Sequence, residues 1–226
     1  MQVQVLISPD VRKAFQGVSL GVGVLAGASI REASEELEAF KREVEERLRG
    51  ELVLEELKDH PVVRVYRDFY WRIGIDPTKQ RPSSEALARR ILRGKSLPRI
   101  NTAVDAYNVA SLETLISIGA YDLDNVELPA VLRKARAGEV FVELGGKSEE
   151  LEEGELVIAD AEKVLNVYPH RDSDLTKITL ETENILVVAC GVPGISPGCV
   201  YEAAEKALRY IQRFCGGEVK ELKAVV

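Results

Sequence analysis

Apolar residues are spaced in two ways along the chain, and the spacing predicts where strands and helices lie. Short apolar runs bounded by glycine and other turn residues are typical of strands, whereas apolar residues three or four positions apart are typical of one helix face. Strand-type runs occupy residues 3–7, 17–25, 140–144, 156–160, 164–168, 176–180 and 185–190. The sequence therefore predicts strands at both ends of a helical middle.

Two amphipathic helices are predicted within that middle. The first carries one apolar stripe, formed by Leu37, Phe40, Val44 and Leu48, and ends at Gly50.

The second helix is expected to begin at Ser83 or Ser84 and to end at Gly94. A hydroxyl before the first turn and a glycine after the last turn satisfy backbone groups that have no partner inside a helix.

Two further helices have recognisable starts. Thr102 is expected to open and cap one of them, and Ser196-Pro197 opens the other, which ends near Gly216. Because strands and helices do not alternate regularly, the order of elements predicts an α+β fold with mixed sheets packed against helices on one side. We expect a single domain over residues 1–226.

Composition supports a folded chain without a membrane span. Of the 226 residues, 46% are hydrophobic and 30% are charged, which is enough apolar material for a core. No apolar run approaches the ~20 residues that cross a bilayer, and the N-terminus lacks the basic and apolar regions of a secretory signal. We expect a cytoplasmic protein. The scarcity of Met, Gln and Asn beside abundant Glu, Lys and Arg resembles thermophile usage.

Histidine and cysteine are scarce, and this argues against a metal site. The chain has two histidines and three cysteines, at gaps of nine and sixteen residues. These numbers do not match a zinc-binding pattern, and an odd cysteine count suits reduced thiols better than a disulfide framework. No metal and no cofactor are expected.

Charge is concentrated in one segment. Residues 61–102 carry a net charge of +7, while the chain as a whole carries −7. A local basic patch can hold phosphates even on an acidic protein, so any contact with nucleic acid should map there. The candidate RNA-binding residues are Lys79, Arg81, Arg89, Arg90, Arg93 and Lys95. Alternatively, these side chains form solvated helix faces or pair with the acidic segment 32–59.

Two familiar motifs occur by spacing alone. Residues 194–198 read G-I-S-P-G, the pattern of a serine nucleophile, but no histidine follows Ser196 to serve as its base. Helix capping explains Ser196 better, although a serine esterase stays open. The glycines of residues 21–26 fall inside a predicted strand, unlike those of a dinucleotide-binding turn.

A dense polar cluster lies between two strand-type runs, at residues 168–177. In the functional interpretation, His170 or Asp172 orients a water molecule and Arg171 or Lys177 meets an anion. The alternative is an ordinary polar turn.

Several short blocks, in order and at matching spacing, resemble the B3/B4 domain of the phenylalanyl-tRNA synthetase β subunit. They are R-I-N-T-A-V-D-A-Y-N at residues 99–108, A-R-A-G-E at 135–139, L-V-I-A-D at 156–160 and Ser196-Pro197. The resemblance covers roughly residues 80–215 and implies a B3/B4 editing-domain architecture.

The segment before these blocks resembles the lead-in of freestanding members of the family. This likeness covers residues 61–82 and implies a core over 61–216 with an N-terminal strand–helix extension, 1–60, packed on it.

The resemblance implies a freestanding editing module that hydrolyses the ester of a mischarged tRNA, without aminoacylation activity. It implies His170 and Asp172 as catalytic residues and the acceptor end of tRNA with its amino acid as partner. The substrate-binding residues implied are Arg99, Asn101, Asp105, Asn108, Arg171, Ser173, Lys177, Gly191 and Ser196. Backbone amides near residues 191–196, or the terminal ribose, would stabilise the oxyanion.

The chain also departs from the family at pocket positions. Pro98 stands where the family has an arginine, with Arg99 one place along, and the pocket histidine is replaced at Gly119. These changes leave the amino acid selectivity open, and they favour the alternative of a noncatalytic module that binds tRNA or an amino acid.

Overall fold

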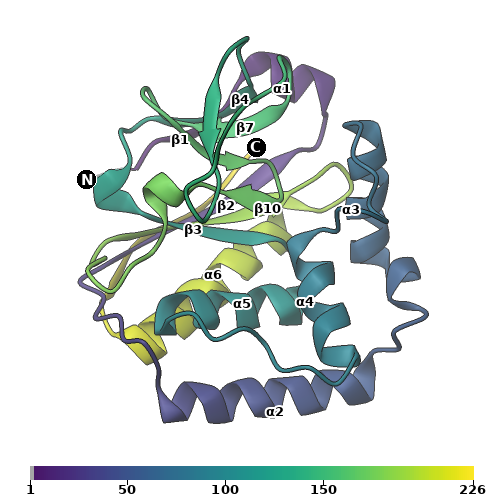
Figure 1. Ribbon diagram of the computed structural model, residues 1–226, viewed down its shortest axis with the longest axis vertical. Helices are drawn as coiled ribbons and strands as arrows, with labels where there is room; N and C mark the ends of the chain where they lie inside the picture. Colours follow the sequence, from purple (N-terminus) through teal and green to yellow (C-terminus); the bar gives the residue numbers. More distant parts are fainter. Residues whose placement is uncertain (1–2) are drawn as a thin grey trace.

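The structure is a computed structural model that describes residues 3–226, and it combines two larger sheets with helices (Figure 1). The helices are α1 (Pro9–Ala14), α2 (Glu35–Glu51), α3 (Pro61–Arg72), α4 (Ser83–Leu92), α5 (Thr102–Thr114) and α6 (Pro197–Cys215). The strands are β1 (Val5–Ile7), β2 (Ser19–Ala26), β3 (Ile118–Asp122), β4 (Ala130–Lys134), β5 (Val140–Val142), β6 (Ser148–Glu150), β7 (Leu156–Ala159), β8 (Val164–Val167), β9 (Arg171–Asp172), β10 (Ile185–Gly191) and β11 (Glu218–Val225). The α+β class and the mixed sheets predicted from the sequence are confirmed.

A four-stranded antiparallel sheet lies at the centre of the molecule. Its strand order is β11-β2-β10-β3, so β2 and β10 are flanked on both sides. All seven residues of β10 are buried. Both inner strands were predicted from their apolar runs, which match strands that are covered on both faces.

A second sheet of five strands lies above the first in Figure 1, in the order β1-β4-β7-β8-β9, with the short β5–β6 hairpin beside it. The strand predicted at residues 176–180 is wrong. A short 3-10 helix, Asp174–Thr176, covers only its first residue, and residues 177–180 form no strand. The Ser173 hydroxyl accepts the backbone N–H of Leu175 and closes the turn that begins this helix.

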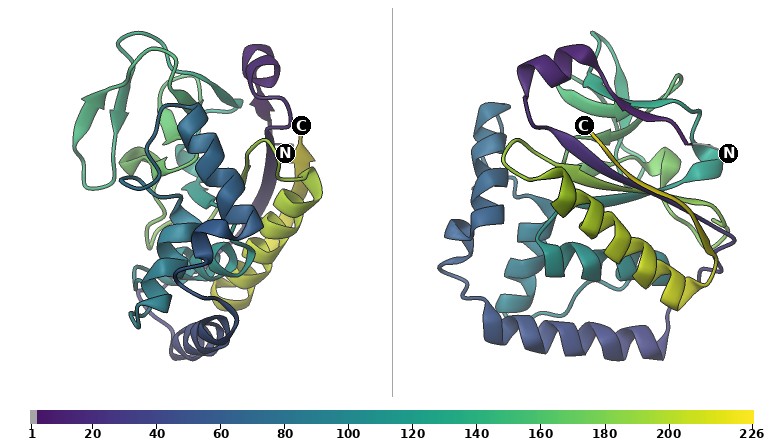
Figure 2. Two further views of the ribbon diagram at one scale, coloured as in Figure 1. Left: turned by 90° about the vertical axis from the view of Figure 1, so that its right-hand side faces the viewer. Right: turned by 180° about the vertical axis from the view of Figure 1, so that it is seen from behind.

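Helices cover the other face of the four-stranded sheet. Figures 1 and 2 show α6 and α5 side by side against it, with α2 beyond α5. The glycines of β2 permit this close approach, since a Cβ at Gly21 would lie 2.0 Å from the carbonyl oxygen of Val200, and one at Gly23 would lie 2.5 Å from Leu208. The glycine-rich run is therefore a packed strand, not a nucleotide-binding turn.

Two of the three predicted helix caps need correction. The Ser196 hydroxyl caps α6 as predicted, but Asn101, not Thr102, caps α5 by accepting the N–H of Val104 at 2.9 Å. Helix α4 has Pro82 at its N-cap, without a side-chain cap, and the buried Ser84 hydroxyl has no hydrogen-bond partner among residues 3–226. The short Asn101 side chain reaches the N–H of Val104, and asparagine is among the residues preferred at this position.

Helix α3 was not predicted from spacing, although its residues fall in the lead-in of the resemblance. Tyr66 joins α3 to the central sheet: its hydroxyl donates to the carbonyl oxygen of Cys190 and accepts the N–H of Ser117 at 3.2 Å. The side chain is completely buried. This contact fixes α3 at the edge of the site described next.

Candidate functional site

Asp172 joins two segments that are distant in the sequence, the polar cluster at residues 168–177 and the region that follows the block at 99–108. Its Oδ1 atom accepts a hydrogen bond from the Tyr121 hydroxyl at 3.0 Å and one from the Asn166 amide at 3.0 Å. Tyr121 lies on β3, Asn166 on β8 and Asp172 on β9. The stretches 99–122 and 168–177 therefore meet at one carboxylate.

This carboxylate has no cationic partner in the described part of the chain. Asp172 forms no salt bridge among residues 3–226, and both of its hydrogen-bond donors are neutral groups on Oδ1. Burial raises the pKa of Asp172, and the hydrogen bonds from Asn166 and Tyr121 offset only part of that rise. The remaining oxygen, Oδ2, keeps its capacity to accept a hydrogen bond from a ligand or a water molecule.

Gly119 makes room for the carboxylate. A Cβ at this position would lie 2.9 Å from Oδ1 of Asp172 and 2.7 Å from the Tyr121 hydroxyl. The Asp172 carboxylate and the Tyr121 phenol therefore fill the space that a side chain at residue 119 would need.

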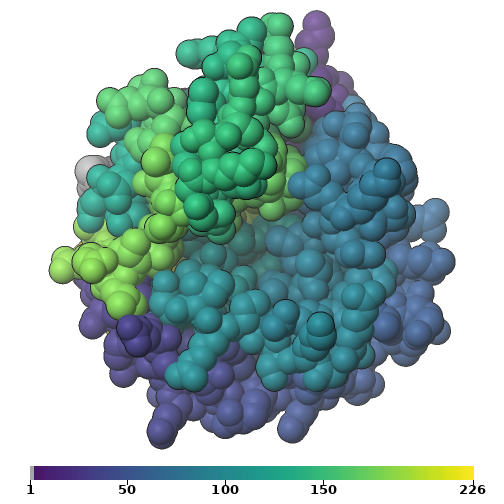
Figure 3. Space-filling view, in the orientation of Figure 1, coloured from purple at the N-terminus to yellow at the C-terminus, as the bar shows by residue number. Residues whose placement is uncertain are grey.

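One face of the molecule is hollowed. Figure 3 shows a recess between green segments and the blue and teal segments. Asn108, on α5, is half-buried and its side-chain amide forms no hydrogen bond within residues 3–226. Tyr107 beside it is nearly buried at 9% exposure, and burial followed by the charge of Asp172 raises its pKa. Asn108 on α5 and Oδ2 of Asp172 on β9 are therefore polar groups that form no side-chain hydrogen bond within residues 3–226.

His170 occupies different surroundings from Asp172. Its ring lies 5.8 Å from that of Tyr70 on α3, and neither the Nδ1 atom of His170 nor the Tyr70 hydroxyl has a hydrogen-bond partner in the described part of the chain. Burial, with a further contribution from the Arg171 charge, lowers the pKa of His170 to about 4. The imidazole is therefore neutral at pH 7, and no hydrogen bond joins it to Asp172 in residues 3–226.

Asp105 on α5 is occupied by structural contacts. Asp105, 3% exposed, pairs with the Lys41 ammonium at 2.7 Å and accepts the N–H of Ile100 at 2.9 Å. Its carboxylate therefore holds α2 against α5, which leaves it little capacity for the substrate contact implied by the resemblance.

Arg99 and Asn101 lie at a separate cavity of about 590 Å³, which Thr179 and Glu181 also line. The Asn101 amide donates to the carbonyl oxygen of Ile178 at 3.3 Å in addition to capping α5. Arg99 is exposed and is the cation that faces this cavity.

Most of the polar cluster at residues 168–177 is paired locally. Arg171 forms an ion pair with Glu149 and lies over the Phe141 ring, Ser173 donates to Val142, and Lys177 pairs with Asp174 at 2.9 Å. These contacts fix the loop around Asp172. Its carboxylate keeps a free oxygen after those contacts are made.

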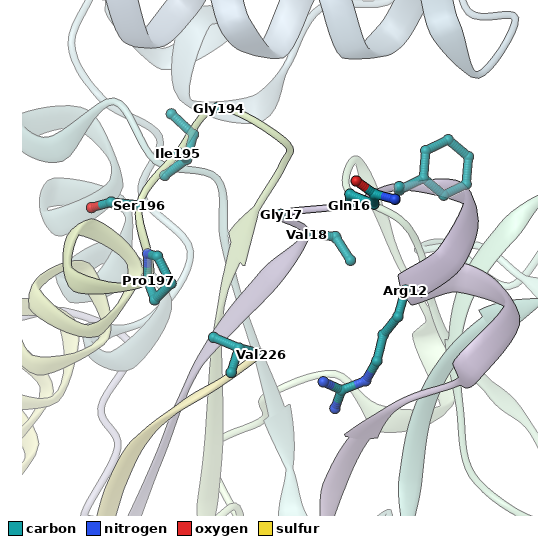
Figure 4. Close-up of a pocket in the computed structure, with 10 residues that line it drawn as sticks. Arg12, Gln16, Gly17, Val18, Gly194, Ile195, Ser196, Pro197 and Val226 are labelled. Carbon is teal, nitrogen blue, oxygen red and sulfur yellow. The ribbon is translucent and has the colours of Figure 1, made fainter.

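Ser196 lines a largely apolar cavity of about 550 Å³ between α1 and the start of α6 (Figure 4). Its hydroxyl accepts the N–H of Cys199 at 3.2 Å and lies 3.1 Å from the Cys199 thiol, so a capping role accounts for it. Gly191 packs against Ser19, where a Cβ would lie 2.5 Å from that hydroxyl. Both residues serve the packing of α6 and β10.

The predicted basic patch forms a groove along α4. The cavity, of about 340 Å³, is lined by Arg81, Ala86, Arg89, Arg90, Arg93 and Lys95. Arg89 is held at 2.7 Å by the buried carboxylate of Glu85, whereas Arg81, Arg93 and Lys95 form no ion pair within residues 3–226. Lys79, also exposed and without an ion pair there, lies outside the lining.

Sequence reasoning did not select Tyr121 and Asn166, which hold Asp172. Asn166 carried a usable signal, because an amide inside the apolar strand Val-Leu-Asn-Val requires a buried partner. Tyr121 had no such signal, since a buried tyrosine is common in cores.

No group of three or more His, Cys, Asp or Glu side chains within residues 3–226 could hold a metal ion. In the same range, the helices are too short or too polar to cross a membrane.

Comparisons with known proteins converge on one family. The family model described as the B3/4 domain matches residues 65–216. The phenylalanine–tRNA ligase beta subunit of Cutibacterium acnes is 28% identical over 163 residues, which cover 62% of this chain and 19% of that subunit. The corresponding subunit of Fusobacterium nucleatum is 36% identical over 113 residues, covering 50% of this chain and 14% of its own length. The chain thus spans less than a fifth of these relatives.

A solved structure shares the fold. An N-terminal fragment of the phenylalanyl-tRNA synthetase beta subunit from Pyrococcus horikoshii aligns with a TM-score of 0.54 at 14% sequence identity. The alignment covers 100% of this chain and 52% of that fragment.

Proposed function

Because this chain belongs to the B3/4 domain family, a family related to tRNA synthetases, we propose that it hydrolyses the ester bond of a mischarged aminoacyl-tRNA. One observation carries the proposal: Asp172 is a buried carboxylate that forms no ion pair within residues 3–226 and receives side-chain hydrogen bonds on only one of its two oxygens. A sheltered acid with a free oxygen is suited to positioning water.

Asp172 orients the attacking water in this proposal. Its raised pKa brings the carboxylate closer to the range in which a general base is effective near neutral pH. Tyr121 and Asn166 fix the carboxylate from the Oδ1 side, so that Oδ2 faces the reaction. His170, which is neutral and not connected to Asp172, borders the site and does not transfer the proton.

The reaction needs no metal and no covalent enzyme intermediate. An aminoacyl ester is already activated, so holding the acyl carbonyl near a water molecule supplies much of the acceleration. Asp172 takes one proton from the water as the water oxygen bonds to the acyl carbon. The bond from that carbon to the ribose oxygen then breaks, and Asp172 returns the proton to the ribose oxygen. Asn108 donates from its side-chain amide to the acyl carbonyl, and the products are a free amino acid and uncharged tRNA.

The α4 groove is the proposed contact for tRNA phosphates. Arg81, Arg93 and Lys95 are exposed cations without carboxylate partners in residues 3–226, a combination that favours binding to a polyanion. Contacts of this kind position an RNA without reading its sequence.

A panel of correctly and wrongly charged tRNAs tests the proposal. We expect the protein to accelerate ester loss for at least one mischarged tRNA above the spontaneous rate, with the Asp172→Asn variant as the matched inactive control. Equal rates with and without protein across the whole panel would refute the deacylase function.

The second candidate is a noncatalytic module that binds tRNA or a free amino acid. Two observations favour it: Gly119 stands where the resembling family has its pocket histidine, and no hydrogen bond links His170 with Asp172 among the described residues. Saturable binding of the same tRNAs without ester loss would select this function.

A further inference from the structure

Trp71, the only tryptophan of the chain, is exposed to solvent. It lies on α3 with 57% of its surface accessible, whereas Tyr70 and Tyr66 on the same helix are completely buried. The buried tyrosines already anchor α3 to the sheet, so Trp71 adds nothing to that packing. A large exposed aromatic side chain beside charged residues is a feature of binding surfaces.

The neighbours of Trp71 on this face of α3 are mainly basic. Arg64, Arg67 and Asp68 precede it by seven, four and three positions, the spacing that places side chains on one helix face. Arg64 is exposed and forms no ion pair within residues 3–226. Asp68 is the acid on this stripe.

A buried carboxylate connects this stripe to the α4 groove. Glu85, at 0% exposure, pairs with Arg67 on α3 at 3.0 Å and with Arg89 on α4 at 2.7 Å. The two arginines therefore meet at one carboxylate, which joins α3 to α4. Of these two joined helices, α3 carries an exposed indole and α4 borders a groove lined by cations.

We infer that Trp71 stacks on an unpaired base of a bound RNA whose backbone phosphates lie along the α3 stripe and the α4 groove. Bases in a duplex are stacked on each other and cannot offer their faces to an indole, so the occupant is single-stranded at this point. Aromatic stacking beside a cationic groove is the usual arrangement for binding single strands without sequence preference. The inference takes from the proposed function only that the partner is RNA.

The single tryptophan makes the contact directly measurable. The intrinsic fluorescence of the full chain is titrated with a single-stranded RNA of about eight nucleotides, with the same sequence as a blunt duplex, and with inorganic polyphosphate. We expect saturable quenching by the single strand and much weaker quenching by the other two. Equal quenching by polyphosphate would show that charge alone acts, and would overturn the stacking contact.

Substitutions separate stacking from charge. Trp71→Ala is expected to weaken binding of the single strand by about 5- to 150-fold, measured with a labelled RNA, because base–aromatic stacking contributes about 1–3 kcal/mol. Trp71→Phe keeps an aromatic face and should retain most of the affinity. Tyr201→Ala, which removes an aromatic that is 37% exposed on α6, is the control and should leave binding unchanged.

Asp68→Asn provides a second, independent readout. Removal of this carboxylate should strengthen RNA binding at low salt, since it lies on the same face as Arg64 and Trp71. Unchanged affinity in both Trp71→Ala and Asp68→Asn would rule out the α3 face as an RNA contact.

These experiments use RNA without an attached amino acid, so they do not depend on ester hydrolysis. Quenching without deacylation would support the α3 contact and refute the proposed hydrolase. Deacylation without quenching, together with normal RNA affinity of Trp71→Ala, would support the proposed hydrolase and refute the α3 contact.

Discussion

The buried acids Asp105 and Glu85 have cationic partners, whereas the buried carboxylate of Asp172 has only neutral ones. In the helices, Asp105 pairs with Lys41, and Glu85 pairs with both Arg67 and Arg89. On β9, Asp172 receives hydrogen bonds only from the neutral side chains of Tyr121 and Asn166. A buried carboxylate with a cationic partner is satisfied by the fold, whereas one without such a partner keeps capacity for a ligand.

This difference separates structural acids from a candidate functional acid, although the sequence presents both as polar residues in apolar surroundings. The resemblance implied Asp105 as a substrate contact, whereas its ion pair with Lys41 holds α2 to α5. If the comparison is correct, substitutions in the two regions should divide cleanly between stability and activity.

The largest effect is expected from Asp105→Asn. The change removes the buried partner of the Lys41 ammonium, which keeps the Glu38 carboxylate at 2.9 Å. Breaking a buried pair costs about 3–5 kcal/mol, and we expect a loss at the lower end of that range because of Glu38. Urea unfolding followed by circular dichroism measures the loss. Glu36→Gln on the same side of the molecule removes an exposed pair with Arg213 and should cost less than about 1 kcal/mol. Similar losses for both variants would contradict the assignment of Asp105 to the fold.

Asp172→Asn should reduce activity much more than stability. We expect deacylation to fall about 100-fold, the lower part of the range for loss of a general base, while the free energy of unfolding changes by less than about 1 kcal/mol. Rates and unfolding curves of one preparation provide both numbers. A variant with normal rates would exclude Asp172 from the chemistry.

Gly119→Ala tests the space around the carboxylate. The added methyl group would lie 2.9 Å from Oδ1 of Asp172 and 2.7 Å from the Tyr121 hydroxyl, so both groups must move. Because a hydroxyl can shift more readily than backbone, we expect a stability loss of roughly 1 kcal/mol together with reduced deacylation. Thermal unfolding and ester loss are the measurements, and unaltered activity would show that the position of Asp172 is not critical.

The smallest effect is a difference in the pH dependence of stability. The folded pKa of Asp172 is raised by burial above the unfolded value near 3.9, so its contribution to stability decreases as pH rises from about 4 through the folded pKa. At Asp160, burial is outweighed by amide hydrogen bonds from Glu127 and Lys163 and by the Lys163 ammonium, and the net result lowers the pKa. Its contribution is present above about pH 4 and is lost as pH falls.

Unfolding free energies at pH 3–7 therefore distinguish the two acids. Asp172→Asn should gain stability relative to the unmodified protein as pH rises, whereas the deficit of Asp160→Asn should shrink on acidification. Parallel slopes for the two variants would show that the folded protein stabilises the charged form of Asp172, against the comparison drawn above.

Elements with strong apolar spacing were predictable, and those stabilised by distant partners were not. The stripe of α2 and the runs of β2 and β10 identified helices and strands that pack over their whole length. Strand β11 has an exposed charged pattern, and its pairing with β2 determines its structure. The run at residues 176–180 misled the prediction because it alternates like a strand, with Thr176 and Ile178 buried, but no strand of residues 3–226 pairs with it.

The candidate site was predictable in part. The polar cluster pointed to Asp172, and the resemblance showed that Gly119 replaces a histidine. Spacing does not reveal that the packing of two different sheets places these residues against each other. The same limit applies to Asp105, whose partner Lys41 is 64 residues away. The sequence shows which residues are acids, but whether a cation lies beside an acid depends on how the whole chain folds.

Strand β2 lies outside the matched residues 65–216, yet it is hydrogen-bonded along its length to β10 on one side and to β11 on the other. A recombinant fragment trimmed to the matched range would leave β10 with an open hydrogen-bonding edge and would uncover the face of α6 that rests on Gly21 and Gly23. Any attempt to graft this fold into another protein must therefore carry the N-terminal residues along with it.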